Sequence, residues 1–333
     1  MERFVFVAAI VVASIFALGA IFGDHDNGRW GIHFSVDGDD DGFGAAELVQ
    51  LAPAQVAAQS YQAGSIRLRH VAARVVVLTE ERADVSVEID NPGGAPTPEI
   101  SLSEGRLTMD GHLRGRIGEC TAEGADLRGY GFVNYDQMPL ITIRAPRDVD
   151  LNFTGAGRAE IGATNDLTLD INGCAHANAA DVANEASLDL NGSGQIVVAG
   201  AREALIDLNG SGSVRVETVR ASADAEVNGS GEVTIANLTG TLNMDNRGSG
   251  SLKVLAGAVT EAEIELFGSG QVRLGAPTER LSVSIFGSGD VDAPVAVGQL
   301  DAEIFGSGDV SVQSVRGTVR QEARGSGSVR IGQ

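Results

Sequence analysis

The sequence predicts an all-β protein whose main part is a right-handed parallel β-helix, a solenoid of about ten coils with 18–20 residues each. Three observations predict this fold: a turn that recurs at fixed spacing, apolar residues that alternate between the turns, and 44 glycines against only 5% aromatic residues. Such a composition suits many short strands and tight turns rather than a thick globular core. Crossovers between parallel strands are nearly always right-handed, which predicts the hand of the coil.

The recurring turn is Gly-Ser-Gly, and glycine suits a corner where neighbouring backbones pass closely. Two degenerate copies come first, at Gly155-Ala156-Gly157 and at Asn172-Gly173-Cys174. The first glycines of the complete copies are Gly192, Gly210, Gly229, Gly248, Gly268, Gly287, Gly306 and Gly325.

Apolar residues fall two apart on both sides of each turn, which predicts strands with one buried and one solvated face. Leu188 and Leu190 precede one turn, and Val214 and Val216 follow the next. A third apolar position completes each coil; it holds Val219, Leu238, Val295 and Val315.

Residues 1–23 are predicted to be a signal or transmembrane anchor that forms an N-terminal hydrophobic helix. The uncharged run 4–23 would span about 30 Å as a helix, the thickness of a bilayer core. An uncleaved anchor in the inner membrane and a cleaved signal peptide both fit. Arg3 before the run and Asp24 after it direct the rest of the chain outward. We therefore expect a cell-envelope protein, periplasmic or surface-exposed.

Residues 24–60 are expected to form an acidic linker. Within it, Asp37 to Gly42 matches the first half of an EF-hand loop, but Leu48 stands where that loop needs a bidentate glutamate. A solvated acidic spacer is therefore expected, with at most weak binding of a divalent cation.

Residues 61–138 are expected to form an N-terminal β-strand region, with an inserted loop over 111–138, and residues 139–333 the Gly-Ser-Gly repeat β-helix. Both cysteines, Cys120 in the insertion and Cys174 in an early coil, make one disulfide possible in an exported protein. Two unpaired thiols remain the alternative.

The strand region, the Pro-Leu-Ile-Thr-Ile-Arg-Ala-Pro run at 139–146 and the serial Gly-Ser-Gly turns resemble the head GIN domain of auto-transporter adhesins. The resemblance covers about residues 60–333 and implies a β-helical, exported bacterial domain with an adhesin-like role. It supplies no catalytic residues.

In a solenoid, one position per coil forms a column along the stack, and two columns stand out. The position before each Gly-Ser-Gly turn holds asparagines, then Arg247, then Phe267, Phe286 and Phe305, then Arg324. Alternation places Ile285 inward and the three phenylalanines outward, where they could bind a glycan or a protein. The alternative is that this column only fills the corner of the coil.

The second column is acidic: Asp170, Asp189, Asp207, Glu226, Asp245, Glu265, Glu303 and Glu322, interrupted by Ser284. Carboxylates at strand spacing should raise one another's pKa. Bases eight residues further on are candidates to relieve this repulsion: Arg215, Lys253, Arg273 and Arg330. The column is interpreted as a solvated face that blocks aggregation or as a weak site for a divalent cation.

The sequence contains no recognisable catalytic or metal-binding motif. No pair of histidines has metal-ligand spacing and no Ser-His-Asp order appears, so we predict no catalytic residue, no metal and no cofactor. The net charge of −21 argues against nucleic acid as a partner.

The leading hypothesis is thus a non-enzymatic, exported envelope protein that binds a surface glycan or protein along one face, with the membrane contacted through residues 4–23. A β-helix enzyme acting on polysaccharides is one alternative, although coils of nearly equal length leave no insertion to build a cleft. A structural spacer that forms a homo-oligomer through its open end is the other.

Overall fold

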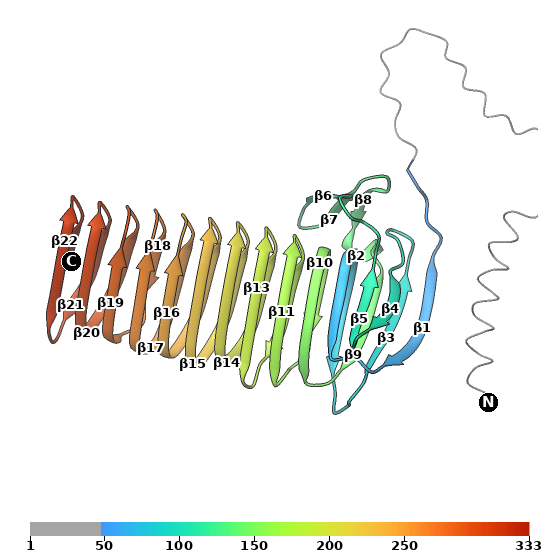
Figure 1. The fold of residues 1–333 in the computed structure, drawn as a ribbon, viewed down its shortest axis with the longest axis horizontal. Helices are drawn as coiled ribbons and strands as arrows, with labels where there is room; N and C mark the ends of the chain where they lie inside the picture. Colours follow the sequence, from blue (N-terminus) through green and yellow to red (C-terminus); the bar gives the residue numbers. More distant parts are fainter. Residues whose placement is uncertain (1–47, 333) are drawn as a thin grey trace, which may run out of the picture. The chain divides into compact units, whose positions relative to one another are not determined.

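The structure, a computed structural model, describes residues 48–332. The predicted hydrophobic helix over 4–23 and the acidic loop that starts at Asp37 lie outside these residues. Within the described part, no helix is long and apolar enough to cross a membrane. The described chain is all-β, and most of it is a solenoid of about ten turns (Figure 1).

The repeat strands run from residue 148 to residue 331. They are β10 (Asp148–Ile161), β11 (Asp166–Gly173), β12 (His176–Asp181), β13 (Glu185–Gly192), β14 (Gln195–Gly210), β15 (Ser213–Gly229), β16 (Glu232–Asn246), β17 (Ser251–Leu266), β18 (Gln271–Leu274), β19 (Thr278–Ile285), β20 (Asp290–Gly306), β21 (Asp309–Val315), β22 (Val319–Gly325) and β23 (Ser328–Ile331).

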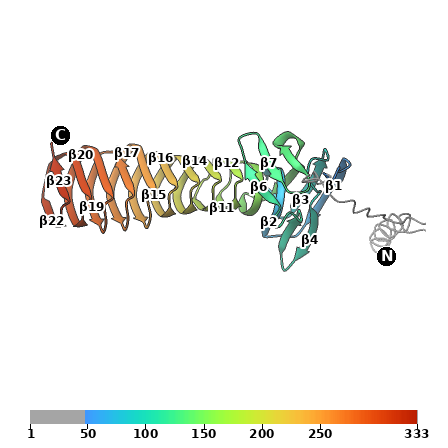
Figure 2. The same ribbon diagram turned by 90° about the horizontal axis from the view of Figure 1, so that it is seen from above.

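The register of these strands follows the period of the sequence. All their pairings are parallel, and each residue pairs with one 18–20 positions later, as Leu188 with Ile206, Val214 with Val233 and Val254 with Leu274. Each coil therefore lies on its predecessor, and the coils form one row (Figure 2). The predicted solenoid is confirmed, while its right hand stays a prediction.

The core fills the inside of the coils. The alternating apolar residues before and after each turn are buried, and their columns join into one continuous cluster. Of the third position, Val219 and Leu238 are fully buried, whereas Val295 and Val315 are half-buried against the same cluster. Burying one face of every strand stabilises the stack, since each coil covers the apolar edge of the coil before it.

Glycine is required at the corner before the turn serine. Gly210 has φ +132°, a conformation that side chains rarely adopt, and a Cβ there would clash with the carbonyl oxygen of Gly192 in the preceding coil. The same clash recurs between Gly229 and Gly210. The spacing of the glycines thus follows from the close passage of one coil over the next.

The strands before residue 148 form what we call the base. They are β1 (Ala54–Tyr61), β2 (Ser65–Thr79), β3 (Val85–Asn91), β4 (Glu99–Ser103), β5 (Arg106–Asp110), β6 (Ile117–Cys120), β7 (Gly124–Leu127), β8 (Gly131–Asn134) and β9 (Leu140–Ala145), with a short 3-10 helix η1 (Tyr135–Gln137).

The stack of coils begins within the base, earlier than the sequence repeats. β2 pairs in parallel with β10, with Ile66 opposite Leu151 and Val75 opposite Ala159. β5 and β9 pair in parallel with the first and second halves of β2. Sequence spacing could not reveal that β2 is a coil, because the strands that pair with it, β5, β9 and β10, do not follow it at the period of the repeat.

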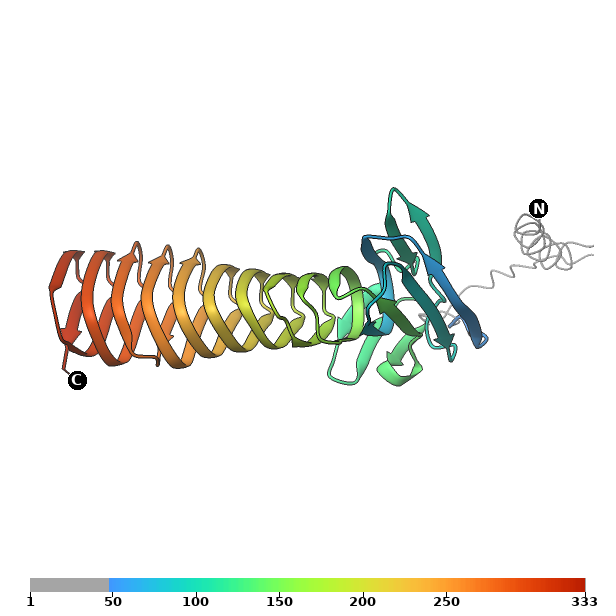
Figure 3. The same ribbon diagram turned by 90° about the horizontal axis from the view of Figure 1, so that it is seen from below.

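Antiparallel strands cover β5 and β9 on the side away from the repeat coils (Figure 3). β3 pairs with β9, β1 pairs with β3, and β4 pairs with β5, all antiparallel. All of β1 except Tyr61 lies inside the stretch 24–60 expected to be linker. Its sequence, rich in alanine and glutamine, gives little strand signal, and pairing with β3 places it in the sheet.

The expected loop over 111–138 is an ordered subdomain. β6, β7 and β8 form a three-stranded antiparallel sheet, and together with η1 they enclose a second apolar cluster that includes Leu113, Leu127 and Met138. Cys120 and Cys174 form a disulfide, with Cα atoms 6.3 Å apart, that ties this subdomain to the turn after β11. The sequence pattern did not predict these strands, because each is only four residues long and glycines interrupt the alternation.

Candidate functional site

The strands before each Gly-Ser-Gly turn present two outward columns, which result from simple alternation. The acidic column holds Asp170, Asp189, Asp207, Glu226, Asp245, Glu265, Ser284, Glu303 and Glu322, and parallel pairing places each member beside the next. The turn column, two residues later, holds Asn172, Asn191, Asn209, Asn228, Arg247, Phe267, Phe286, Phe305 and Arg324.

The asparagines of the turn column hydrogen-bond to the acids of their own strand. Asn191 donates from Nδ2 to Asp189 Oδ1 at 2.6 Å, and Asn209 donates to Asp207 at 2.8 Å. Asn228 makes the equivalent bond to Glu226 at 3.0 Å. An acid and an asparagine two residues apart on one face thus form a local pair, which accounts for both columns in this half of the stack.

Burial and crowding act together on the acidic column. The pKa of Asp189 is raised, first by partial burial and then by the charges of Asp207 and Asp170. Burial, followed by the charge of Glu226, raises the pKa of Asp207. The expectation of mutual repulsion thus has the right direction, but loss of water around the carboxyls is the larger cause.

The bases eight residues further on do not relieve this column, so that expectation is wrong. Lys253 binds Glu232 at 2.6 Å and Arg330 binds Asp309 at 2.9 Å. The other two bases behave alike, Arg215 pairing with Glu217 and Arg273 with Asp292. These bases lie on the strands after the turn. Their carboxylate partners lie on the same face of those strands and are nearer to them than the acidic column is.

Two arginines of the turn column do reach the acids. Arg247 forms ion pairs with Glu226 and Asp245, and Arg324 forms one with Glu322 at 2.6 Å. Next to Arg247, Asn246 occupies an inward position and is buried, with its side chain bonded to the turn at Gly248 and Gly250. The column changes from asparagine to arginine and phenylalanine at this coil.

Phe267, Phe286 and Phe305 form a continuous stack, which we call the Phe stack. The ring centroids of Phe267 and Phe286 are 5.0 Å apart with planes within 7°, and those of Phe286 and Phe305 are 5.3 Å apart with planes within 4°. The guanidinium of Arg324 lies 5.4 Å from the Phe305 ring and extends the stack. Parallel rings at these distances attract one another.

The side chains of the Phe stack point away from the core, in line with the alternation of the sequence. Phe267 and Phe286 are each 44% exposed, while neighbouring Ile285 is fully buried. Because Phe286 has a parallel ring on either side, its faces are covered by neighbours and its edge meets the solvent. The surface therefore presents a strip of aromatic edges.

Polar groups border this strip on both sides. Glu265 and Glu303 of the acidic column lie two residues before the phenylalanines, and the turn serines lie two residues after them. The hydroxyls of Ser269 and Ser288 are 3.3 Å apart and continue the serine row. An apolar centre with hydrogen-bonding edges is the usual composition of a contact surface.

The acidic column also lines a shallow cavity of about 350 Å³ on the asparagine half of the stack, which includes Asp189, Leu205 and Asp207. Among residues 48–332, however, no group of three or more His, Cys, Asp or Glu side chains is arranged to hold a metal ion. The weak cation site expected from the sequence stays a prediction.

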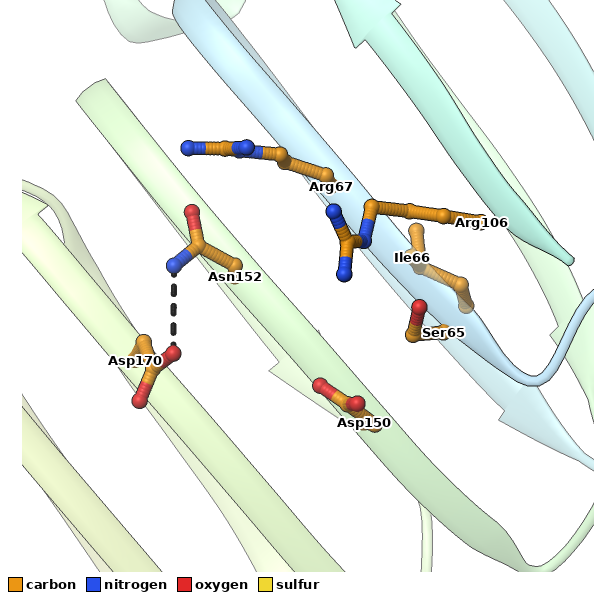
Figure 4. Close-up of a pocket in the computed structure, with 7 residues that line it drawn as sticks. All are labelled: Ser65, Ile66, Arg67, Arg106, Asp150, Asn152 and Asp170. Atoms are coloured by element: carbon orange, nitrogen blue, oxygen red, sulfur yellow. Dashed lines mark hydrogen bonds between the residues drawn. The ribbon is translucent and has the colours of Figure 1, made fainter. Parts of the chain in front are cut away.

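A second cavity, of about 290 Å³, lies where the base meets the first coils; we call it the base cavity (Figure 4). Its lining residues come from four strands: Ser65, Ile66, Arg67, Arg106, Asp150, Asn152 and Asp170. Sequence reasoning missed this group, because nothing in the sequence brings Arg67, Arg106 and Asp150 together until β2 is recognised as a coil.

Several solved structures are similar to this chain. A "putative lipid binding protein" of Parabacteroides distasonis has 18% identity and a TM-score of 0.46, covering 85% of this chain and 97% of its own. A "putative adhesin" of the same species has 15% identity and a TM-score of 0.41, covering 84% and 97%. Another from Parabacteroides merdae has 18% identity and a TM-score of 0.36, covering 85% and 97%. Similarity at this level says nothing of what the chain binds.

The family comparison is more decisive. The family model described as "Putative auto-transporter adhesin, head GIN domain" matches residues 126–258, 177–293 and 239–332. The matches overlap because a repeat fits a model in more than one register. No curated protein shows significant similarity. Since the matches together span residues 126–332, more than half of the 333, the chain belongs to the family of auto-transporter adhesin head GIN domains.

Proposed function

We propose that this chain is a non-enzymatic protein of the cell envelope that binds a surface partner through the Phe stack. The observation that carries the proposal is the exposure of the stack: Phe267 and Phe286 are exposed, Phe305 is half-buried, and the three rings form one continuous strip outside the core. Exposed apolar strips bordered by polar groups typically mark interaction sites.

The family supports a role at the cell surface, since its description names an adhesin. The sequence supports the same location through its apolar run at 4–23, which would anchor the chain in the inner membrane or direct its export. The disulfide between Cys120 and Cys174 also suits an oxidising compartment outside the cytoplasm.

The partner is a surface glycan or a surface protein, and the ring geometry favours a protein. A sugar ring binds best against the open face of an aromatic ring, whereas the faces of Phe286 are covered by its neighbours. Aromatic edges instead suit the irregular apolar side chains of a protein. Carboxylates of Glu265 and Glu303 beside the stack favour a partner with basic or hydrogen-bond-donating groups at its rim.

Binding is proposed rather than catalysis because the repeat coils are nearly uniform. Register shifts between coils amount to one residue, as at Gly240 and Thr241, so no long insertion rises from the described coils to form a deep cleft. A polysaccharide-cleaving site would need paired acids and bases positioned around a bound chain.

The test compares two triple variants of the full-length chain in mild detergent. Phe267→Ser, Phe286→Ser and Phe305→Ser remove the stack, while Asn191→Ser, Asn209→Ser and Asn228→Ser change the same column in earlier coils. Retention is measured on immobilised envelope proteins and polysaccharides. We expect the phenylalanine variant alone to lose at least about tenfold in affinity, because buried aromatic anchors dominate binding energy.

Circular dichroism separates the possible failures of this test. Equal retention by both variants would place binding elsewhere on the molecule. Loss of the strand signal in the phenylalanine variant would show that the stack maintains the coil instead of presenting a surface.

A further inference from the structure

The base cavity combines opposite charges that do not neutralise one another directly. Arg67 and Arg106 both line it, and within residues 48–332 neither guanidinium forms an ion pair. Arg69, two residues after Arg67 on the same strand, does pair, with Asp110 at 3.7 Å. The two cavity arginines therefore keep their N–H donors available to a ligand.

The acids of the cavity are placed to accept hydrogen bonds. The pKa of Asp150 is raised, first by burial and then by the charge of Asp170, and the charge of Arg106 opposes this only in part. Asp150 and Arg106 both line the cavity but form no ion pair with each other, so space remains between the two groups. Asn152 donates from Nδ2 to Asp170 Oδ2 at 3.1 Å, which leaves the amide oxygen of Asn152 and the second carboxylate oxygen of Asp170 as acceptors. Figure 4 shows the Arg106 guanidinium pointing into the space bounded by Asn152, Asp150 and Ser65.

This arrangement selects the charge of a ligand. Two guanidinium groups attract an anion and offer the forked donors that match a carboxylate. Two carboxylates nearby repel a dianion such as phosphate, yet they accept hydrogen bonds from hydroxyl groups. A volume of about 290 Å³ is at the lower end of small-molecule sites, which suits a single sugar-sized unit.

We propose that the base cavity binds a uronic acid unit, whose carboxylate accepts hydrogen bonds from Arg106 and Arg67 while its hydroxyls donate to Asp150 and Asp170. This site is independent of the Phe stack, which lies in later coils. The acidic column that follows Asp170 repels a polyanionic chain, so the cavity takes a terminal unit of a glycan and not the middle of an acidic polymer.

The test uses the full-length chain in mild detergent with three probes. Binding of D-glucuronate and D-glucose is measured by ligand-observed saturation-transfer NMR, and binding of inorganic phosphate, which has no carbon-bound proton, is measured by the broadening of its phosphorus NMR signal. Glucuronate is expected to bind, in the high-micromolar to millimolar range of an open, wet site, and glucose about tenfold more weakly, because it lacks the charged acceptor. Equal binding of glucose and glucuronate, or no transfer to glucuronate, would overturn the proposal.

Three variants locate the site. Arg106→Gln should weaken glucuronate binding about tenfold, whereas the matched control Arg69→Gln, outside the cavity, should leave it unchanged. Asp150→Asn should weaken glucuronate binding and strengthen phosphate binding, since the amide is a weaker acceptor for a hydroxyl than the carboxylate and carries no repelling charge.

Each remaining outcome contradicts the proposal. An equal loss in Arg69→Gln would indicate general attraction of anions to the base. Tighter glucuronate binding by Asp150→Asn would mean that the cavity recognises charge alone. Because Arg106 is exposed, Arg106→Gln is expected to keep the wild-type thermal midpoint. Asp150→Asn removes a carboxylate whose pKa is raised by burial, so it is expected to keep or raise the midpoint; circular dichroism checks both.

Discussion

The base and the repeat coils hold together in different ways. In the coils, every strand pairs with strands one coil away, and the same inward columns repeat along one cluster. The base combines parallel pairs with antiparallel hairpins, encloses a separate apolar cluster and is tied to an early coil by a disulfide. The difference shows that short-range repetition stabilises the coils, whereas the base depends on contacts made once.

This contrast also concerns function. The Phe stack arises from repetition, because only equivalent positions in successive coils can align three rings. The base cavity arises where repetition fails, from strands that are far apart in the chain. Columns are suited to an extended contact surface, and the irregular base is suited to a single small ligand.

The largest expected effect breaks a contact that the base makes only once. Replacing both Cys120 and Cys174 by serine opens a bridge with a sequence separation of 54, which should cost up to about 4 kcal/mol by loop entropy. Hydrogen exchange should show lost protection over residues 111–138 and unchanged protection in β15 and β16. Uniform loss along the coils would contradict the separation between base and repeats.

The second effect breaks the repetition itself. Gly210→Ala forces a side chain into positive φ and against the Gly192 carbonyl, which should lower the unfolding free energy by about 3 kcal/mol. Its matched control is Gly64→Ala, in the residue just before β2, where a Cβ meets no atom within 4 Å. The control should change stability by less than about 1 kcal/mol. Urea unfolding followed by circular dichroism measures both, and similar values would refute the close passage of coils.

A smaller effect, the dependence of stability on pH, distinguishes the acidic column from the ion-paired acids on the strands after the turn. Because the folded pKa of Asp189 is raised, its ionised form destabilises the fold at neutral pH. Asp189→Asn should raise the unfolding free energy by about 0.5–1 kcal/mol at pH 7. This gain should shrink as the pH falls through the raised folded pKa and vanish by about pH 3, below the unfolded pKa, where the acid is protonated in both states.

Glu232→Gln provides the opposite control. Lys253 lowers the pKa of Glu232 by a hydrogen bond, so this acid stabilises the fold above its unfolded pKa and loses that effect as the pH falls through its lower folded pKa. The variant should be less stable than wild type by about 0.5 kcal/mol at pH 7 and equal to it near pH 3. Thermal unfolding over this pH range tests both acids; shifts of the same sign would contradict the account.

What the sequence predicted follows the same division. The period, the buried alternation and the outward direction of Phe286 could all be read from residues a few positions apart. The partner of Lys253 could not be read in this way. Asp245, before the turn, is close to Lys253 in sequence, but Glu232 of the preceding coil lies on the same face and forms the ion pair. The base cavity was invisible for a related reason, since its arginines and acids meet through the pairing of β2 with β10.

The central claim is that the described coils bind a partner without altering it. The most direct measurement incubates the full-length chain, in mild detergent, with a panel of envelope proteins and polysaccharides, and reads the masses of retained and released molecules. The account predicts that a partner is retained with its mass unchanged, and that the phenylalanine triple variant releases it. Shortened or unsaturated polysaccharide products would contradict the claim and indicate an enzyme.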